Sequence, residues 1–301
     1  MGDRWVRRMA RDGLTRVSVA VMDGAVETAR TCHRATPIAT VALGRAMVAA
    51  TLISSTLRDE GRVNLQIVGN GPLGAVAVDA AASGTVRGSV RCPMVLIPIG
   101  TSARARVAPG LGHSGLLHVL LDPHGGQYVR GSCELVDGEV DADVEAYLHQ
   151  SAQLASAFGT DVRIRADRAA VERAVGVLVQ AMPGSDGKQV EDAQARLRDG
   201  GLARLLGDGP LPDPNEIVQR VVDGAAYKDA EERAVRWFCP CSRERVKDAL
   251  AAVGRDEVRA IIDEVGQAEA TCDFCRSVYV IPGAELEQLL TTMAARATRS
   301  S

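Results

Sequence analysis

Four of the seven cysteines in this chain lie in two closely spaced pairs. Cys239 and Cys241 form a C-x-C pair, and Cys272 and Cys275 form a C-x-x-C pair after 30 intervening residues. The short spacing inside each pair lets neighbouring sulfurs converge on one centre, so we expect the four thiolates to bind one soft metal ion tetrahedrally. Zinc is the expected ion, one per reduced chain, and an iron–sulfur cluster is the alternative.

No imidazole competes with these sulfurs nearby in the sequence. All five histidines lie far upstream, and they are His33, His113, His118, His124 and His149. A four-sulfur site has no open position for a water molecule, which argues against catalytic zinc. The short spacing also makes each pair a potential disulfide, so metal binding and oxidation compete for the same sulfurs.

The other three cysteines, Cys32, Cys92 and Cys133, stand alone in apolar or strand-like contexts. We interpret them as inert thiols and predict no role for them. Cys32 is followed by His33, but neighbours on a strand point to opposite faces, so we expect no activated thiol there.

The composition excludes several classes of protein. The chain has 301 residues, of which 46% are hydrophobic and 24% charged, and a formal net charge of -3, which gives no electrostatic case for binding nucleic acid or an anionic membrane. No run of eighteen apolar residues is free of charge, and the first residues lack the apolar core of a secretory signal. We therefore expect a cytoplasmic protein, where paired cysteines indicate a metal or redox site before a disulfide framework.

Hydrophobic periodicity predicts an α+β fold, with a mixed sheet-and-helix domain over residues 1–182. Alternating apolar residues predict strands near 17–21, 63–67, 76–78 and 86–90, and a further strand or buried segment is expected at 171–182. Thr36 and Pro37 predict the start of a helix that runs to about Leu57, and a second helix is expected over 141–158.

Two smaller regions follow this domain. Residues 183–236 are expected to form a helical linker with short amphipathic helices at 190–206 and 217–222, which are too short to be stable without a neighbour. Glu231, Glu232 and Arg233 are interpreted as an exposed helix face. Residues 237–301 are expected to form a zinc-binding domain.

Within this last region we expect two short helices between the cysteine pairs, a hairpin near 271–281 and a final helix. Trp237, Phe238 and Phe274 are expected to form a small core beside the metal.

The residues around the cysteines resemble the 33 kDa chaperonin family of redox-regulated heat-shock proteins. The resemblance covers Arg236–Val246, with its Phe-Cys-Pro-Cys-Ser-Arg-Glu-Arg segment, and Thr271–Tyr279. It continues at 43–45, 65–74 and 86–88 in the N-terminal half, whereas residues 100–130 are glycine-rich and depart from the family pattern.

This resemblance implies a nucleotide-independent holdase chaperone of the oxidative stress response. The sequence has neither a Walker A motif nor a G-x-G-x-x-G that joins a strand to a helix, as dinucleotide binding would need. In the reduced protein the four cysteines would hold zinc. Oxidation to Cys239–Cys241 and Cys272–Cys275 disulfides would release the zinc, unfold the C-terminal region and expose a surface for unfolding client proteins. The resemblance also implies a homodimer when oxidised, with the first domain as the dimerisation domain.

Two other functions compete with this interpretation. A zinc-ribbon protein that binds nucleic acid would need a basic stripe with interleaved aromatic residues, which the acidic balance of the chain does not favour. A dithiol oxidoreductase using Cys272 and Cys275 would need its motif at the start of a helix in a strand-helix-strand unit, whereas here a hairpin is expected. We therefore expect no enzyme.

Overall fold

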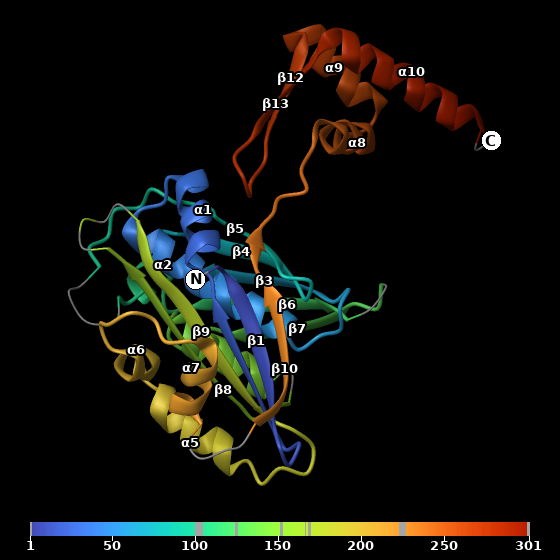
Figure 1. The fold of residues 1–301 in the computed structure, drawn as a ribbon. Helices are drawn as coiled ribbons and strands as arrows, with labels where there is room; N and C mark the ends of the chain where they lie inside the picture. The colour runs from blue at the N-terminus through green and yellow to red at the C-terminus, as the bar shows by residue number, and fades with distance from the viewer. Residues whose placement is uncertain are drawn as a thin grey trace. The chain divides into compact units, whose positions relative to one another are not determined.

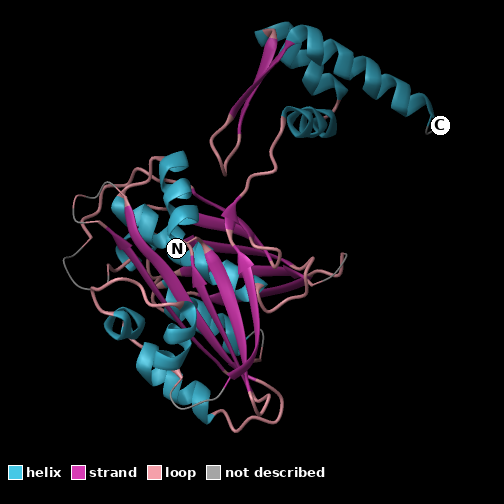
Figure 2. Cartoon of the chain, viewed as in Figure 1, coloured by secondary structure: helices cyan, strands magenta, loops and turns pink. Residues whose placement is uncertain are grey.

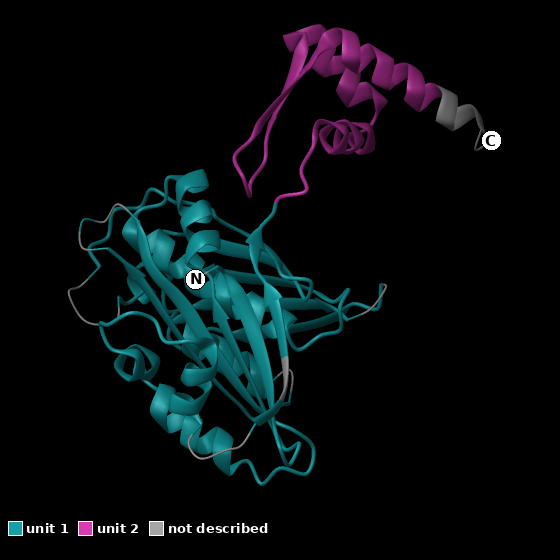
Figure 3. Cartoon of the chain, in the orientation of Figure 1, with its two compact units in different colours: residues 1–238 teal, residues 239–301 magenta. Residues whose placement is uncertain are grey.

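The computed structural model describes residues 2–99, 105–123, 126–150, 153–165, 167, 170–222 and 227–299 (Figure 1). Helices and strands are mixed along the chain, which confirms the predicted α+β class (Figure 2). The chain divides into two compact units, residues 1–238 and residues 239–301 (Figure 3). The finer division into three domains at 182 and 236 stays a prediction.

Unit 1 is built on two β-sheets. The five-stranded sheet has the order β10-β1-β2-β9-β8, and the six-stranded sheet has the order β11-β5-β4-β3-β6-β7. Neighbouring strands are antiparallel, except that β11 runs parallel to β5. The strands of unit 1 are β1 (Arg4–Ala10), β2 (Thr15–Val21), β3 (Arg62–Gly69), β4 (Ala75–Ala81), β5 (Thr85–Val90), β6 (Gly115–Asp122), β7 (Val129–Glu134), β8 (Ser156–Ile164), β9 (Val171–Ala181), β10 (Tyr227–Ala234) and β11 (Arg236–Trp237).

Helix α2 (Pro37–Ser54) lies between the two sheets and contacts strands of both. Every residue after Pro37 is buried, because a helix that is covered on all sides is apolar all round. Its one charged residue, Arg45, pairs with the buried Glu139 at 2.9 Å. By length and composition α2 could cross a membrane, but 94% of it is buried within unit 1, as in a core helix. Helices α1 (Asp23–His33), α3 (Ala108–Leu111) and α4 (Val140–Gln150) complete this layer.

Three short helices cover the other face of the five-stranded sheet. They are α5 (Lys188–Leu197), α6 (Gly201–Leu206) and α7 (Pro214–Val221), and Figure 1 shows them along one side of the sheet. Alternate valines of β2 and β9 form one apolar cluster with side chains of these helices. The cluster includes Val17, Val19, Val21, Val175, Val177, Val179, Val190, Leu197, Leu202, Leu206, Ile217 and Val221. This packing provides the neighbour that such short helices need.

Some of the predicted elements of unit 1 are wrong. The helix expected over 141–158 ends at Gln150, and Ser156 begins strand β8, whose first seven residues are all buried. A strand that is buried on both faces has no alternation, so its apolar run is not distinguishable from a helix by periodicity.

The segment 231–233 is also not a helix. It lies in the edge strand β10, where Glu231 pairs with Arg7 and Glu232 with Arg4 on the neighbouring β1. These charge pairs stabilise the strand across the sheet, and sequence order does not reveal them. Cys32 lies in helix α1 and not in a strand, so strand alternation does not describe its relation to His33.

Unit 2 contains α8 (Arg243–Val253), α9 (Arg255–Val265), the hairpin of β12 (Gln267–Thr271) and β13 (Val278–Pro282), and α10 (Gly283–Arg299). The predicted helices and hairpin are confirmed. The apolar core of its described residues has only five buried members: Val258, Ala268, Ile281, Leu286 and Leu290. The expected aromatic core is wrong, because Trp237 packs against the core of unit 1 and Phe238 is 45% exposed.

Candidate metal and redox centre

The first cysteine pair lies in an extended segment that leads into helix α8. Side chains two residues apart on an extended chain point to the same side, so Cys239 and Cys241 face one centre across Pro240. Proline fixes its own backbone angle φ and so stiffens the segment. Directly after Cys241, the Ser242 side chain accepts a hydrogen bond from the amide of Arg245 at 3.3 Å and caps the helix.

The second pair lies in the turn of the β12–β13 hairpin. The amide of Cys272 donates to the carbonyl of Ser277, and the amide of Arg276 donates to the carbonyl of Cys272, both at 2.9 Å. Arg276 takes a left-handed conformation, with φ of 59°, which closes the turn. The amides of Phe274 and Cys275 donate to the sulfur of Cys272. Such amide donors favour the thiolate form of a cysteine.

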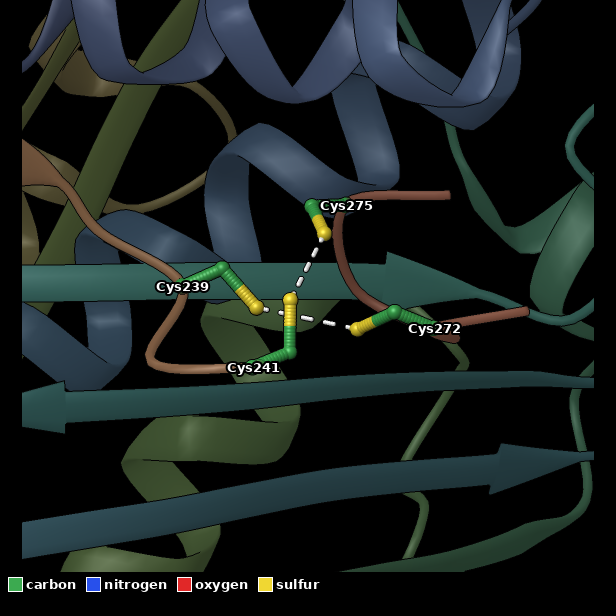
Figure 4. A group of neighbouring side chains, drawn as sticks. All are labelled: Cys239, Cys241, Cys272 and Cys275. Atoms are coloured by element: carbon green, nitrogen blue, oxygen red, sulfur yellow. Dashed lines mark hydrogen bonds between the residues drawn. The ribbon is translucent and has the colours of Figure 1, made fainter. Parts of the chain in front are cut away.

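The two segments bring all four sulfurs together, within 4.8 Å of one another (Figure 4). The shortest contacts join one cysteine of each pair: Cys239 Sγ lies 3.6 Å from Cys272 Sγ, and Cys241 Sγ lies 3.2 Å from Cys275 Sγ. With zinc–sulfur bonds of about 2.3 Å, the sulfurs of a tetrahedral site lie about 3.8 Å apart. The arrangement therefore fits a four-thiolate zinc site, and unit 2 has no histidine.

The surroundings of the sulfurs change the pKa of their thiols in opposite directions. Burial raises the pKa of Cys241 to about 12, and burial also raises the pKa of Cys272. Burial opposes ionisation of Cys275 too, but hydrogen bonds from the side chain and backbone of Ser277, and then from the other sulfurs, lower its pKa to about 6. Cys275 therefore ionises near neutral pH, and a bound dication would deprotonate the other thiols as well.

Two hydroxyl groups contact the sulfurs from the hairpin. The hydroxyl of Tyr279 on β13 lies 3.1 Å from Cys241 Sγ, and Ser277 Oγ lies 3.2 Å from Cys275 Sγ. The hydrogen bond with Cys241, followed by burial, raises the pKa of Tyr279 to about 12, so the phenol keeps its proton. Sequence reasoning assigned no role to these two residues, because the contact of Tyr279 with Cys241 depends on how the hairpin folds back.

An ion pair ties the two cysteine-bearing segments together away from the sulfurs. Glu285, at the start of α10, binds Arg243, the first residue of α8, at 2.6 Å and Lys247, one turn later in α8, at 2.5 Å. Hydrogen bonds from Arg243 and then Lys247 lower the pKa of Glu285 to about 2. The pair is partly exposed, so it orients the segments and adds little to stability.

The remaining cysteines and histidines do not join this centre. Cys92 is exposed, Cys32 is partly buried in α1, and Cys133 is buried in β7, where burial raises its pKa. Among the histidines, His33, His113 and His118 contact Gly88, Asp137 and Ser132, and His149 ends helix α4. His124 lies outside the described residues.

Comparison with known proteins gives one consistent match. The family model described as Hsp33 protein matches residues 3–282. The 33 kDa chaperonin of Synechococcus sp. (strain JA-2-3B'a(2-13)) is 40% identical over 299 residues, which cover 97% of this chain and 92% of that protein. The 33 kDa chaperonin of Bacillus subtilis (strain 168) is 33% identical, with 95% and 98% covered. The crystal structure of the 33 kDa chaperonin from Thermotoga maritima is similar with a TM-score of 0.86 at 29% identity, with 98% of this chain and all of that chain covered.

We expect removal of the metal to unfold unit 2 and to leave the strands of the apolar core of unit 1 folded. Structural zinc supplies about 10–16 kcal/mol in small zinc peptides. The five buried apolar side chains of unit 2 contribute roughly 1.5–3 kcal/mol each, which alone is far less than the conformational entropy lost on ordering the unit, at about 1–2 kcal/mol per residue. Amide hydrogen exchange of the reduced full-length chain should show loss of protection in α8, α9 and α10 after a chelator is added, while β3, β4 and β9 stay protected.

The substitutions C272S and C275S together should abolish zinc binding, whereas C92S should retain one zinc per chain, because Cys92 is exposed and lies far from the sulfurs in sequence. Full protection of α8–α10 in the metal-free protein would contradict a structural role for the metal.

Proposed function

The chain belongs to the Hsp33 protein family, and we propose that it is a chaperone that holds unfolding proteins without nucleotide and is activated by oxidation. The observation that carries the redox part of this proposal is the convergence of Cys239, Cys241, Cys272 and Cys275 in a unit with a very small apolar core. A single event at those sulfurs can therefore decide whether the whole unit is folded.

In the reduced state the four thiolates hold one zinc ion. The zinc cross-links the two segments and so supplies stability that the small apolar core of unit 2 does not provide. Each pair can then be oxidised by one molecule of peroxide. A thiolate attacks a peroxide oxygen, the O–O bond breaks, and the cysteine becomes a sulfenic acid while hydroxide leaves. The neighbouring thiolate attacks the sulfenic sulfur, an S–S bond forms, and hydroxide leaves again. Two peroxides thus oxidise four thiolates, and the disulfide sulfurs no longer coordinate Zn²⁺, which is released unchanged.

The pairing of the disulfides determines the outcome. Bonds Cys239–Cys241 and Cys272–Cys275 lie within the two segments and leave them unconnected. The shortest sulfur contacts, however, run between the segments, and disulfides formed there would fasten unit 2 in place of the metal. Activation by unfolding therefore requires pairing within each segment, which the short C-x-C and C-x-x-C spacing favours.

The surface that would become available to clients lies beneath helices α5–α7. These helices cover the valines of β2 and β9, and none of the three exceeds ten residues. The chain continues from α7 through β10 and β11 directly to Cys239, and β11 is held to β5 by only two paired residues. We propose that disorder in unit 2 spreads back along this path and loosens the helices. An uncovered valine surface of this kind binds apolar segments of unfolding proteins or a second copy of the chain, giving the oxidised homodimer.

A polar clamp also holds these helices to the sheet. Arg173 on β9 donates to the carbonyls of Gly207 at 2.9 Å and Gly209 at 2.6 Å, in the connection between α6 and α7. The same guanidinium pairs with Asp161 on β8 at 3.1 Å, and both side chains are buried. Loss of Arg173 would weaken the hold on this connection, to which Arg163 on β8 also binds through Asp208 at 2.6 Å and the carbonyl of Ala203 at 3.2 Å, and would leave the four cysteines in place.

The redox switch predicts that the chain suppresses aggregation only after oxidation. Light scattering of a heat-unfolding client should be unchanged by reduced, zinc-loaded protein and reduced by peroxide-treated protein. Peptide mapping should show two disulfides, each within one segment, and a chromogenic chelator should detect one zinc released per chain. Equal suppression by both forms, or disulfides between the segments, would contradict the proposal.

The clamp predicts that R173M binds clients without an oxidant. The loss of buried hydrogen bonds to a charged group should cost about 2 kcal/mol of local stability and expose the amides of α5–α7 to faster exchange. The variant should still bind one zinc per chain. R165M is the matched control, because Arg165 is 59% exposed and its ion pair with Asp167 lies at the surface. Faster exchange in α5–α7 without client binding would exclude the valine surface as the client site.

A further inference from the structure

Helix α8 contributes no buried side chain to unit 2. Of its 11 residues, only Val246 and Leu250 pack against the apolar core, and both are partly buried. The five buried members of that core come from α9, β12, β13 and α10. Cys239 and Cys241 lie directly before α8, so whatever holds this helix in place also holds the first cysteine pair near the second.

One carboxylate supplies the ion pairs that join α8 to the rest of unit 2. Glu285 Oε1 accepts a hydrogen bond from Arg243 Nη2 at 2.6 Å, and its Oε2 accepts one from Arg243 Nε at 3.3 Å. Lys247 Nζ lies 2.5 Å from the same Oε2. No other ion pair among the described residues connects α8 to a different element. Glu285 is itself fixed by α10, because the next residue, Leu286, is fully buried in the core.

The forked contact between Glu285 and Arg243 differs from an ordinary surface ion pair. Two hydrogen bonds fix the guanidinium and the carboxylate in one orientation, and bidentate pairs of this kind are the surface pairs that contribute measurably. We infer that Glu285 is a positioning residue that holds α8, and the cysteines before it, close to the second cysteine pair, and that this makes the retention of zinc sensitive to ionic strength. The inference rests on the zinc site of the proposed function and adds a control to it.

The dependence on salt follows from the exposure of the three side chains. Arg243, Lys247 and Glu285 are 38%, 30% and 29% exposed, so dissolved ions reach the ion pairs and screen them. Folding of unit 2 and zinc binding are coupled in the proposed function, so stability that is lost from the ion pairs is measured as lost zinc affinity. Zinc should therefore leave the sulfurs more readily at high salt, and a lower concentration of oxidant should then activate the chain.

The test compares E285Q with E287Q in the reduced full-length chain. Both variants remove one negative charge from α10, but Glu287 pairs with Arg259 on α9, at 3.9 Å. Competition with a chromogenic chelator at about 50 mM salt should give E285Q an apparent zinc affinity about fivefold below that of the unmodified chain. At about 1 M salt the difference should shrink to less than about twofold, because screening has already weakened the ion pairs. E287Q should stay within about twofold of the unmodified chain at both salt concentrations.

A second measurement separates the positioning of α8 from a general loss of stability. Amide hydrogen exchange of zinc-loaded E285Q should become about threefold faster or more in α8 and stay unchanged in α9 and α10. The exchanged pair R243E/E285R should regain most of the zinc affinity that E285R loses, because opposite charges again face each other across the two helices.

Three results would overturn the positioning role. They are equal zinc affinities of E285Q and the unmodified chain at low salt, equally faster exchange in α8, α9 and α10, and no recovery of affinity in R243E/E285R. Zinc binding by the unmodified chain would still support the proposed function in each of these cases. An unmodified reduced chain that binds no zinc would overturn both.

Discussion

The structure depends on a mismatch between the size of unit 2 and the apolar surface that it can bury. Unit 2 spans 63 residues, and those that the structure describes form three helices and a hairpin around five buried side chains. Small domains of this kind usually need a cross-link of some sort. The four sulfurs are the groups in unit 2 that are arranged to provide one. If they hold a metal and are oxidised as proposed, the fold of the unit depends on the chemical state of its cysteines.

Unit 1, in contrast, is held together by a large apolar core. Helix α2 is enclosed by two sheets, and its core is continuous from Trp5 to Val235. None of the four clustered cysteines belongs to this core, so we do not expect their oxidation to unfold it. Between these extremes lie α5–α7, which are short and are held by one apolar face and the Arg173 clamp. The three parts therefore differ in what holds them: a cluster of sulfurs in unit 2, one apolar face and a few polar contacts in α5–α7, and a large apolar core in the rest of unit 1.

Much of this organisation could be predicted from the sequence where a pattern is local. The alternation at Val17, Val19 and Val21 identified β2, and the cysteine spacing identified all four sulfurs that converge. Features that depend on distant partners could not be predicted. Strand β8 is buried on both faces, and β10 consists largely of charged residues whose partners lie on β1, so neither has the pattern of a half-buried strand. The contact of Tyr279 with Cys241 spans 38 residues and exists only after the hairpin folds.

The charged edge strand β10 has a consequence for refolding after the proposed activation. Glu231 lies directly opposite Arg7, and Glu232 binds Arg4 at 3.2 Å, so complementary charges specify one alignment of β10 on β1. Strands whose alignment rests only on similar apolar side chains can slip by two residues and become trapped. A strand that is guided by ion pairs can detach and rejoin in its original register, and its acidic side chains discourage pairing with the edges of other molecules. The ion pairs between β10 and β1 would thereby restore the same strand register in each round of unfolding and refolding.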